Sequence, residues 1–350
     1  MSKKSIRIEA MEARSVTAIP TGPEWQYEPK WDGFRCLLKR ESDFVAMHAK
    51  SGQDLSRYFP EVVAAALALR ESSFILDGEI VVPVKGKLSF DDLLQRIHPA
   101  ASRVKKLAEQ TPALFLVFDL LRKGKAEIGD EPLLKRRPQL DEFAACHFSS
   151  RSLFRLSPAS VRRRDAQRWL ESAGGGSDGV IAKRLDLPYQ AGNREGMQKI
   201  KRYRSADCVI GGFRYGENAQ LGRKVIGSIL LGLYDADRVL HHVGFSSGIK
   251  SKDKPALTDK LEAVAQVESF TGKAPGGPSR WSTKRSSEWQ PVKPKYVVEV
   301  SYDHFTGGRF RHGTSILRWR RDKKPFQCTF EQLDQKVDST LFSKLKVNDC

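Results

Sequence analysis

The chain has 350 residues, enough for two domains, and 40% of them are hydrophobic, so a sizeable core is available. Lysines and arginines number 60 against 42 aspartates and glutamates, and the resulting net charge of +18 is spread over both halves of the chain. The hydrophobic content excludes a chain that cannot form a core, and the net charge excludes an acidic protein. The positive charge indicates a polyanionic partner such as nucleic acid.

The cysteines and the apolar segments indicate the cellular compartment in which the protein is expected. The five cysteines are scattered and never form a CxxC pair, which argues against a zinc site or a disulfide framework and fits a reducing compartment. No apolar run follows the N-terminus as in a secretory signal, and no stretch has the length of a transmembrane helix. We therefore expect a soluble intracellular protein without membrane contact.

Residues 28–35 (EPKWDGFR) concentrate chemically active side chains. In an extended segment Lys30 and Asp32 share one face, because side chains alternate, and Gly33 then allows a turn or a close backbone approach. A lysine attacks as a nucleophile only when its amine is neutral, which requires desolvation or another cation nearby. The alternative is a surface strand with alternating charges.

The remainder of the first half alternates predicted strands and helices. Strands are expected at 44–48, 74–82, 114–121 and 180–182, and helices at 59–70, 90–97 and 159–172. Asp77 and Glu79 share one face of an otherwise apolar strand, where carboxylates are costly unless they are paired or bind a metal. Lys199 and Lys201 also stand two apart, and two ammonium groups on one face suit an anion such as phosphate.

A glycine-rich segment at 174–179 formally matches GxGxxG. Its glycines precede a predicted strand, whereas a dinucleotide-binding loop follows a strand and opens a helix. We therefore reject a dinucleotide site and expect a loop that presents Asp178 and Lys183.

From residue 206 onward the pattern changes to short β-rich segments separated by glycine turns, which predicts a small β-barrel. One helix is expected at 255–268, and strands are expected at 208–215, 225–234, 239–245, 296–302 and 309–319. We place the domain boundary so that residues 1–204 form one domain and residues 205–350 another.

Seven motifs in order resemble those of the covalent nucleotidyltransferases, the superfamily of ATP-dependent DNA ligases, RNA ligases and mRNA capping enzymes. The first, at 30–35 (KWDGFR), resembles KxDGxR, and the last, at 320–323 (RRDK), resembles RxDK. The others lie at 51–61, 77–79, 117–121, 178–184 and 199–201. The likeness covers nearly the whole chain and is greatest to two-domain bacterial ATP-dependent DNA ligases of the ligase C type.

The resemblance implies an α+β fold, with an adenylyltransferase (ATP-grasp-like DNA ligase) domain followed by an OB-fold β-barrel. It implies an enzyme that takes AMP from ATP on Lys30, adenylates the 5′-phosphate of a break in duplex DNA and joins it to a 3′-hydroxyl, in DNA repair and recombination. We expect ATP with Mg²⁺ or Mn²⁺, nicked or broken duplex DNA, other repair proteins as partners and a monomer at the nucleoid in the bacterial cytoplasm.

The same resemblance implies how a nucleotide would be held. Glu28 and Phe118 would contact the adenine. Arg35, Lys50 and Glu79 would surround the ribose and the phosphates.

Cations further along the chain would hold the phosphates. Lys199 and Lys201 would hold the α-phosphate. Arg320 and Lys323, supported by Asp322, would close over the pyrophosphate from the second domain.

The carboxylates would support catalysis. Asp32 and Asp77 would assist the chemistry, and Glu79 and Asp178 would hold the metal ion. The chain departs from many ligases by having Asp178 in place of glutamate and Lys50 in place of arginine, which bears on the metal position and on contacts near the nick.

Three alternatives stay open on the sequence. An RNA ligase would differ in the strand that it seals, and a capping-type guanylyltransferase would use GTP. A basic nucleic-acid clamp would have no catalysis at all, but it would have no use for the charges that gather in these motifs.

Overall fold

The computed structural model describes residues 9–174, 176–220, 222–276, 288–311 and 313–333. These residues form two compact units, one that ends at Arg202 and one that begins at Tyr203. Each unit has its own hydrophobic core. In the described part of the chain, no helix is both long and apolar enough to cross a membrane.

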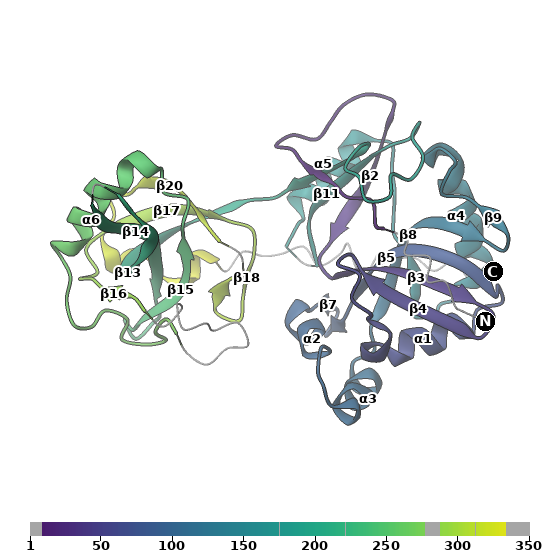
Figure 1. Cartoon of the computed structure of the whole chain (residues 1–350), viewed down its shortest axis with the longest axis horizontal. Helices are drawn as coiled ribbons and strands as arrows, with labels where there is room; N and C mark the ends of the chain where they lie inside the picture. The colour runs from purple at the N-terminus through teal and green to yellow at the C-terminus, as the bar shows by residue number, and fades with distance from the viewer. Residues whose placement is uncertain (1–8, 175, 221, 277–287, 312, 334–350) are drawn as a thin grey trace. The chain divides into compact units, whose positions relative to one another are not determined.

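The first unit contains a six-stranded sheet in the order β10-β8-β5-β3-β4, with β9 paired to β8 (Figure 1). All neighbours are antiparallel except β10 and β8. The strands are β3 (Phe34–Glu41), β4 (Phe44–Ala49), β5 (Ser73–Val81), β8 (Leu114–Lys123), β9 (Ala126–Glu127) and β10 (Phe154–Leu156). The short pair β6 (Pro83–Val84) and β7 (Lys87–Leu88) follows β5.

Helices α1 (Pro60–Leu67) and α4 (Leu133–His147) pack on one face of this sheet and leave the other for the site. Helix α2 (Phe90–Gln95) adds Leu93 to the same core, and α3 (Ala101–Gln110) packs against α1. Because side chains alternate along a strand, Cys36 and Leu38 of β3 enter the core with α1 and α4, whereas Arg35 points to the opposite face.

A four-stranded sheet, in the order β1-β12-β11-β2, completes the first unit. Its strands are β1 (Arg14–Ser15), β2 (Trp25–Trp31), β11 (Ser177–Arg184) and β12 (Met197–Lys201), and α5 (Arg163–Glu171) packs on it. β1 pairs in parallel with β12, so the beginning and the end of this unit lie side by side.

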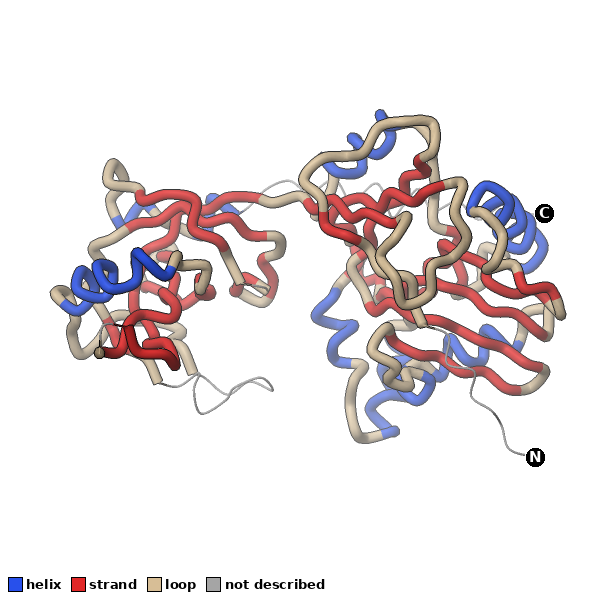
Figure 2. The backbone as a smooth tube through the Cα atoms, turned by 45° about the horizontal axis from the view of Figure 1, so that its top comes forward, coloured by secondary structure: helices blue, strands red, loops and turns tan. Residues whose placement is uncertain are grey.

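The second unit is a curved antiparallel sheet in the order β15-β14-β13-β17-β20, with β16 paired to β13, and Figure 2 shows a helix beside it. Its main elements are β13 (Arg204–Gln220), β14 (Arg223–Tyr234), β15 (Leu240–Ser246), α6 (Lys254–Glu262), β16 (Gln290–Pro291), β17 (Val297–Tyr302) and β20 (Ser315–Trp319). A short hairpin joins β18 (Phe305–Thr306) to β19 (Arg309–Phe310). A single bridge between Ser246 and Thr314 links the two edge strands, so no continuous ladder closes a barrel among the described residues.

Most predicted strands and helices are present, with shifted ends. The helix expected at 159–172 begins at Arg163, and the strand expected at 309–319 divides into β19 and β20. The sequence pattern missed α3 and α4. Pro138 lies inside α4 and interrupts the pattern, although tertiary contacts keep the helix in place.

Candidate active site

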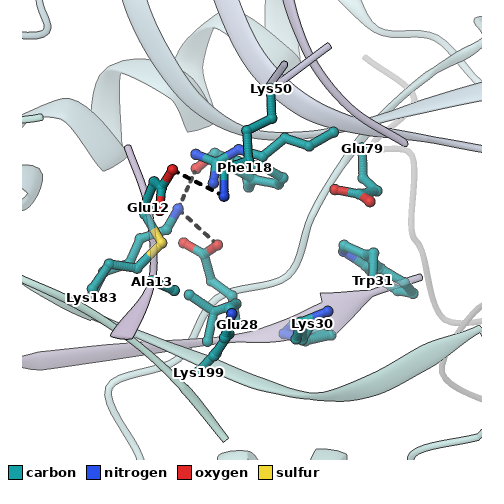
Figure 3. Close-up of a pocket in the computed structure, with 14 residues that line it drawn as sticks. Glu12, Ala13, Glu28, Lys30, Trp31, Lys50, Glu79, Phe118, Lys183 and Lys199 are labelled. Atoms are coloured by element: carbon teal, nitrogen blue, oxygen red, sulfur yellow. Dashed lines mark hydrogen bonds and ion pairs between the residues drawn. The ribbon is translucent and has the colours of Figure 1, made fainter. Parts of the chain in front are cut away.

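The two sheets of the first unit enclose a pocket of about 210 Å³. Its residues come from strands that are distant in the sequence, and Figure 3 shows them converging on one space. The β2, β11 and β12 side contributes Glu28, Lys30, Ile181, Lys183 and Lys199, and the other sheet contributes Arg35, Lys50, Glu79 and Phe118. The pocket therefore gathers most of the residues that the first-unit motifs single out.

Lys30 lines the pocket, and a neighbouring carboxylate balances its positive charge. Its Nζ is 2.8 Å from Oδ1 of Asp178, and Nζ of Lys201 is 3.4 Å from Oδ2 of the same carboxylate. The β2–β11 register shifts between Ser177 and Gly179, so Asp178 sits at a bulge, a feature that can redirect a side chain. One carboxylate thus holds two lysines together.

Asp32 follows the end of β2, and its carboxylate lies close to that of Asp178. One oxygen of each approaches the other to within 4.8 Å. Carboxylate oxygens at this spacing suit a hard divalent cation such as Mg²⁺.

Glu79 faces the pocket from β5. Its carboxylate accepts a hydrogen bond of 3.1 Å from the backbone N–H of Gly33. A side chain on Gly33 would place its Cβ 2.2 Å from the carbonyl oxygen of Ile80, so only glycine permits this approach. Burial raises the pKa of Glu79 to about 8, although the charges of Lys30 and Arg35 oppose the shift.

Asp77 is fully buried and holds Arg35 in place. The guanidinium donates two hydrogen bonds to Asp77, of 3.1 and 2.6 Å, and the hydroxyl of Tyr189 donates a third of 2.6 Å. Burial raises the pKa of Tyr189, so this hydroxyl remains a donor. Arg35 lies 5.4 Å from the ring centroid of Phe118, next to the surface on which a flat base can stack.

Glu28 belongs to a buried ion pair on the floor of the pocket (Figure 3). Nζ of Lys183 lies 2.9 Å from one carboxylate oxygen of Glu28, and the side-chain amide of Gln26 donates to the other at 2.9 Å. Nζ of Lys183 also lies 4.6 Å from the centroid of the Phe118 ring. A carboxylate in such a pair accepts hydrogen bonds and donates none.

Lys50 and Lys199 provide positive charge at the rim. Lys50 is paired with Glu12 at 3.1 Å, and Glu12 also binds Arg194 at 2.9 Å. Burial lowers the pKa of Lys199, and the charges of Lys30 and Lys201 lower it further. An anion would relieve this concentration of positive charge.

The terminal motif lies in the second unit and forms its own cluster. Arg320 binds Asp322 on one side and Asp207 on the other, and Lys323 also binds Asp207.

Sequence reasoning missed several members of these networks. It assigned no role to Glu12, Tyr189 or Asp207 and gave Lys183 no place among the site residues. Their partners are far away in the sequence (Tyr189 lies 112 residues from Asp77), so no local spacing reveals them. The one available signal was Lys183, a charged residue directly after the predicted apolar strand 180–182. The structure places both Asp178 and Lys183 within β11, not on the expected loop, and buries them.

A pocket between two sheets that combines a lysine, carboxylates and further cations is the arrangement of a nucleotidyltransferase. The family model described as "ATP dependent DNA ligase domain" matches residues 9–201, and the model described as "ATP dependent DNA ligase C terminal region" matches residues 222–323. The chain belongs to the family of ATP-dependent DNA ligases.

Individual relatives agree with this assignment. DNA ligase C1 of Mycolicibacterium smegmatis is 42% identical over 97% of both chains, and DNA ligase C of Mycobacterium tuberculosis is 38% identical over 95% of this chain and 96% of that protein. A solved Lig E DNA ligase, at 14% identity, shares the fold with a TM-score of 0.55 over 90% of this chain and 100% of that one. The predictions of an ATP-dependent DNA ligase of the ligase C type and of its fold are confirmed.

Proposed function

We propose that Lys30 is the residue that carries AMP. Its neutral amine attacks the α-phosphorus of ATP, an N–P bond forms, the bond to pyrophosphate breaks and the amine loses a proton. The 5′-phosphate of a DNA break then attacks the same phosphorus, and Lys30 leaves and regains a proton. Finally the 3′-hydroxyl loses its proton, bonds to the 5′-phosphorus and displaces AMP.

The remaining pocket residues hold the nucleotide in this proposal. Glu28 accepts a hydrogen bond from the adenine amino group, and Phe118 stacks on the ring. Arg35, Lys50 and Glu79 surround the ribose and the phosphates.

The phosphate charge is met by cations on both units. Lys199 and Lys201 hold the α-phosphate, and Arg320 and Lys323, supported by Asp322, hold the pyrophosphate. In this division residues 1–204 form the adenylation domain and residues 205–350 the OB-fold domain, both of which extend beyond the described part of the chain.

The carboxylates of the first unit fit Mg²⁺ or Mn²⁺. Asp32 and Asp178 offer neighbouring oxygens, and Glu79 offers another at the pocket wall. A bound ion would neutralise phosphate charge and polarise the phosphorus. Asp77, which binds Arg35, supports the site by orientation.

The relatives support a proposal for the biological setting. The multifunctional non-homologous end joining DNA repair protein LigD of Mycobacterium tuberculosis is 30% identical over 88% of this chain and 38% of that protein. We propose that this chain seals nicked or broken duplex DNA in repair and recombination, as a monomer alone or with repair partners, at the nucleoid in the bacterial cytoplasm.

The observation that carries the proposal is the position of Lys30, which lines the pocket and lies 2.8 Å from Asp178. The test is incubation with Mg²⁺ and α-labelled ATP or, separately, GTP, followed by a search for acid-labile, base-stable label. We expect label from ATP that Lys30→Ala abolishes. Lys39→Ala, at a half-buried lysine outside the pocket that pairs with Glu41, should leave the label unchanged.

Other outcomes have distinct meanings. Label from GTP alone would support a guanylyltransferase. Absence of label, with no mass shift that pyrophosphate reverses, would overturn covalent catalysis by Lys30.

A further inference from the structure

Asp207 stands near the start of β13, and its carboxylate joins the two cations of the terminal motif. Nη1 of Arg320 lies 2.9 Å from both carboxylate oxygens, and Nζ of Lys323 lies 2.8 Å from Oδ2. One oxygen therefore bridges a guanidinium and an ammonium group. Two like charges that would repel one another are held side by side.

The backbone of Asp207 is clamped in place. Its N–H donates to the side-chain oxygen of Gln332 at 2.7 Å, and the side-chain nitrogen of Gln332 donates back to its carbonyl at 3.0 Å. Asp207 is only 9% exposed. A carboxylate fixed in this way acts as part of the framework rather than as a side chain that swings between partners.

Both cations keep hydrogen-bonding capacity beyond these contacts. Asp322 accepts from Nε and Nη2 of Arg320, and Asp207 accepts from Nη1. A guanidinium has five N–H groups and an ammonium has three, so each retains at least one donor beyond its carboxylate contacts in the described structure.

We propose that Asp207 is a positioning residue for the adenylation step, which holds Arg320 and Lys323 together as a preformed site for the pyrophosphate group of ATP. The inference rests on the proposed role of these two cations. Preorganised charges stabilise a leaving group without reorganisation during the reaction, whereas separated cations would have to be reassembled.

The test is Asp207→Asn, which keeps the shape and removes the charge. We expect kcat/KM for ATP in Lys30 adenylation to fall by about tenfold or more, and KM for pyrophosphate in the reverse reaction to rise by a similar factor. Sealing of a nick that already carries 5′-AMP releases no pyrophosphate, so its rate should stay within about twofold.

Two results would overturn the proposal. Faster adenylation would mean that Asp207 competes with pyrophosphate for the cations. An equal loss in adenylation and in sealing of the preadenylated nick would mean a structural role only.

A matched control lies directly opposite Asp207 on β17. Glu299 is the cross-strand partner of Asp207, and its ion pair is with Arg318. Its charge acts on Arg320 only at a distance, so Glu299→Gln should change adenylation far less than Asp207→Asn does and should leave sealing of the preadenylated nick unchanged. Asp207→Glu should restore part of the lost rate.

Three more variants keep the test decisive. If Asp207→Asn fails to fold, Gln332→Ala loosens the clamp but keeps the carboxylate, and we expect a smaller loss confined to adenylation. If Arg320→Ala and Lys323→Ala leave adenylation unchanged, the proposed role of the terminal motif fails, which separates that failure from a failure of Asp207.

Discussion

Lys30 forms an ion pair with Asp178, whose carboxylate oxygen lies 2.8 Å from its Nζ. An ammonium group has no lone pair for attack on phosphorus, so the amine must lose its proton before it reacts. A divalent cation at Asp178 would compete with Lys30 and Lys201 for that carboxylate. In the proposed mechanism, a metal ion that binds Asp178 would therefore release the Lys30 amine for attack.

Glu79 makes the site sensitive to pH, because burial raises its pKa to about 8. Below that pH the carboxyl group keeps its proton, and a metal ion bound there, as proposed, would have to displace it. We expect the Mg²⁺ concentration for half-maximal Lys30 adenylation to fall as the pH rises from 7 to 9, by at most about tenfold per unit.

Glu79→Gln supplies the control, because an amide has no proton to release in this range. The variant should need more Mg²⁺, and its requirement should change less with pH than that of the parent protein. An identical pH dependence in the two proteins would assign the titration to another group.

Gly33 leaves no room for a side chain, since a Cβ would lie 2.2 Å from the carbonyl of Ile80. We expect Gly33→Ala to destabilise the protein by about 1–3 kcal/mol and to displace Glu79, slowing adenylation by about tenfold or more. Thermal unfolding and the labelling assay measure the two effects. Gly248→Ala, where no atom lies within 4 Å, should change neither.

At the scale of elements, one buried ion pair attaches α4 to β8. Arg136 of α4 and Asp119 of β8 form two hydrogen bonds of 3.0 Å, and their side chains are only 2% and 3% exposed. Burial alone would raise the pKa of Asp119, but Arg136 lowers it below its usual value. The stability that this interaction provides is therefore present near neutral pH and is lost as the pH falls through the lowered pKa.

Removal of one partner would leave the other charge buried and unpaired. We expect Arg136→Ala to lower the free energy of unfolding by about 3–5 kcal/mol, and the double variant Arg136→Met with Asp119→Leu to recover most of it. Lys123→Ala removes an exposed pair with Glu142 and should cost less than about 1 kcal/mol. Chemical denaturation compares the variants, and an equal loss in the single and double variants would contradict this account.

Some residues and elements of the site could be predicted from the sequence, and others could not. Asp77 and Glu79 were identifiable because carboxylates in an apolar strand need a partner. The partners themselves depend on sheet order, and nothing near Lys50 in the sequence points to Glu12, nor anything near Asp77 to Tyr189. Helix α4 was missed because its proline obscures the pattern, and its anchor at Asp119 is a tertiary contact.

At the scale of the molecule, the charge of +18 should dominate affinity for DNA. Each phosphate contact by a lysine or arginine releases counterions, so six contacts would weaken binding by about 10³-fold between 50 and 200 mM salt. Fluorescence anisotropy with a nicked duplex measures this dependence. A slope of log Kd against log salt below about two would contradict a binding mode based on phosphate contacts.

The pairing of β1 with β12 has a consequence for biosynthesis. Residues 12–13, which precede β1, and Lys199 on the paired strand β12 both line the pocket of the first unit. A nascent chain on the ribosome cannot complete this pocket until the segment up to residue 201 has emerged. If ATP binds in this pocket, as proposed, it can stabilise only the finished first unit, and the growing chain must reach that point without help from its substrate.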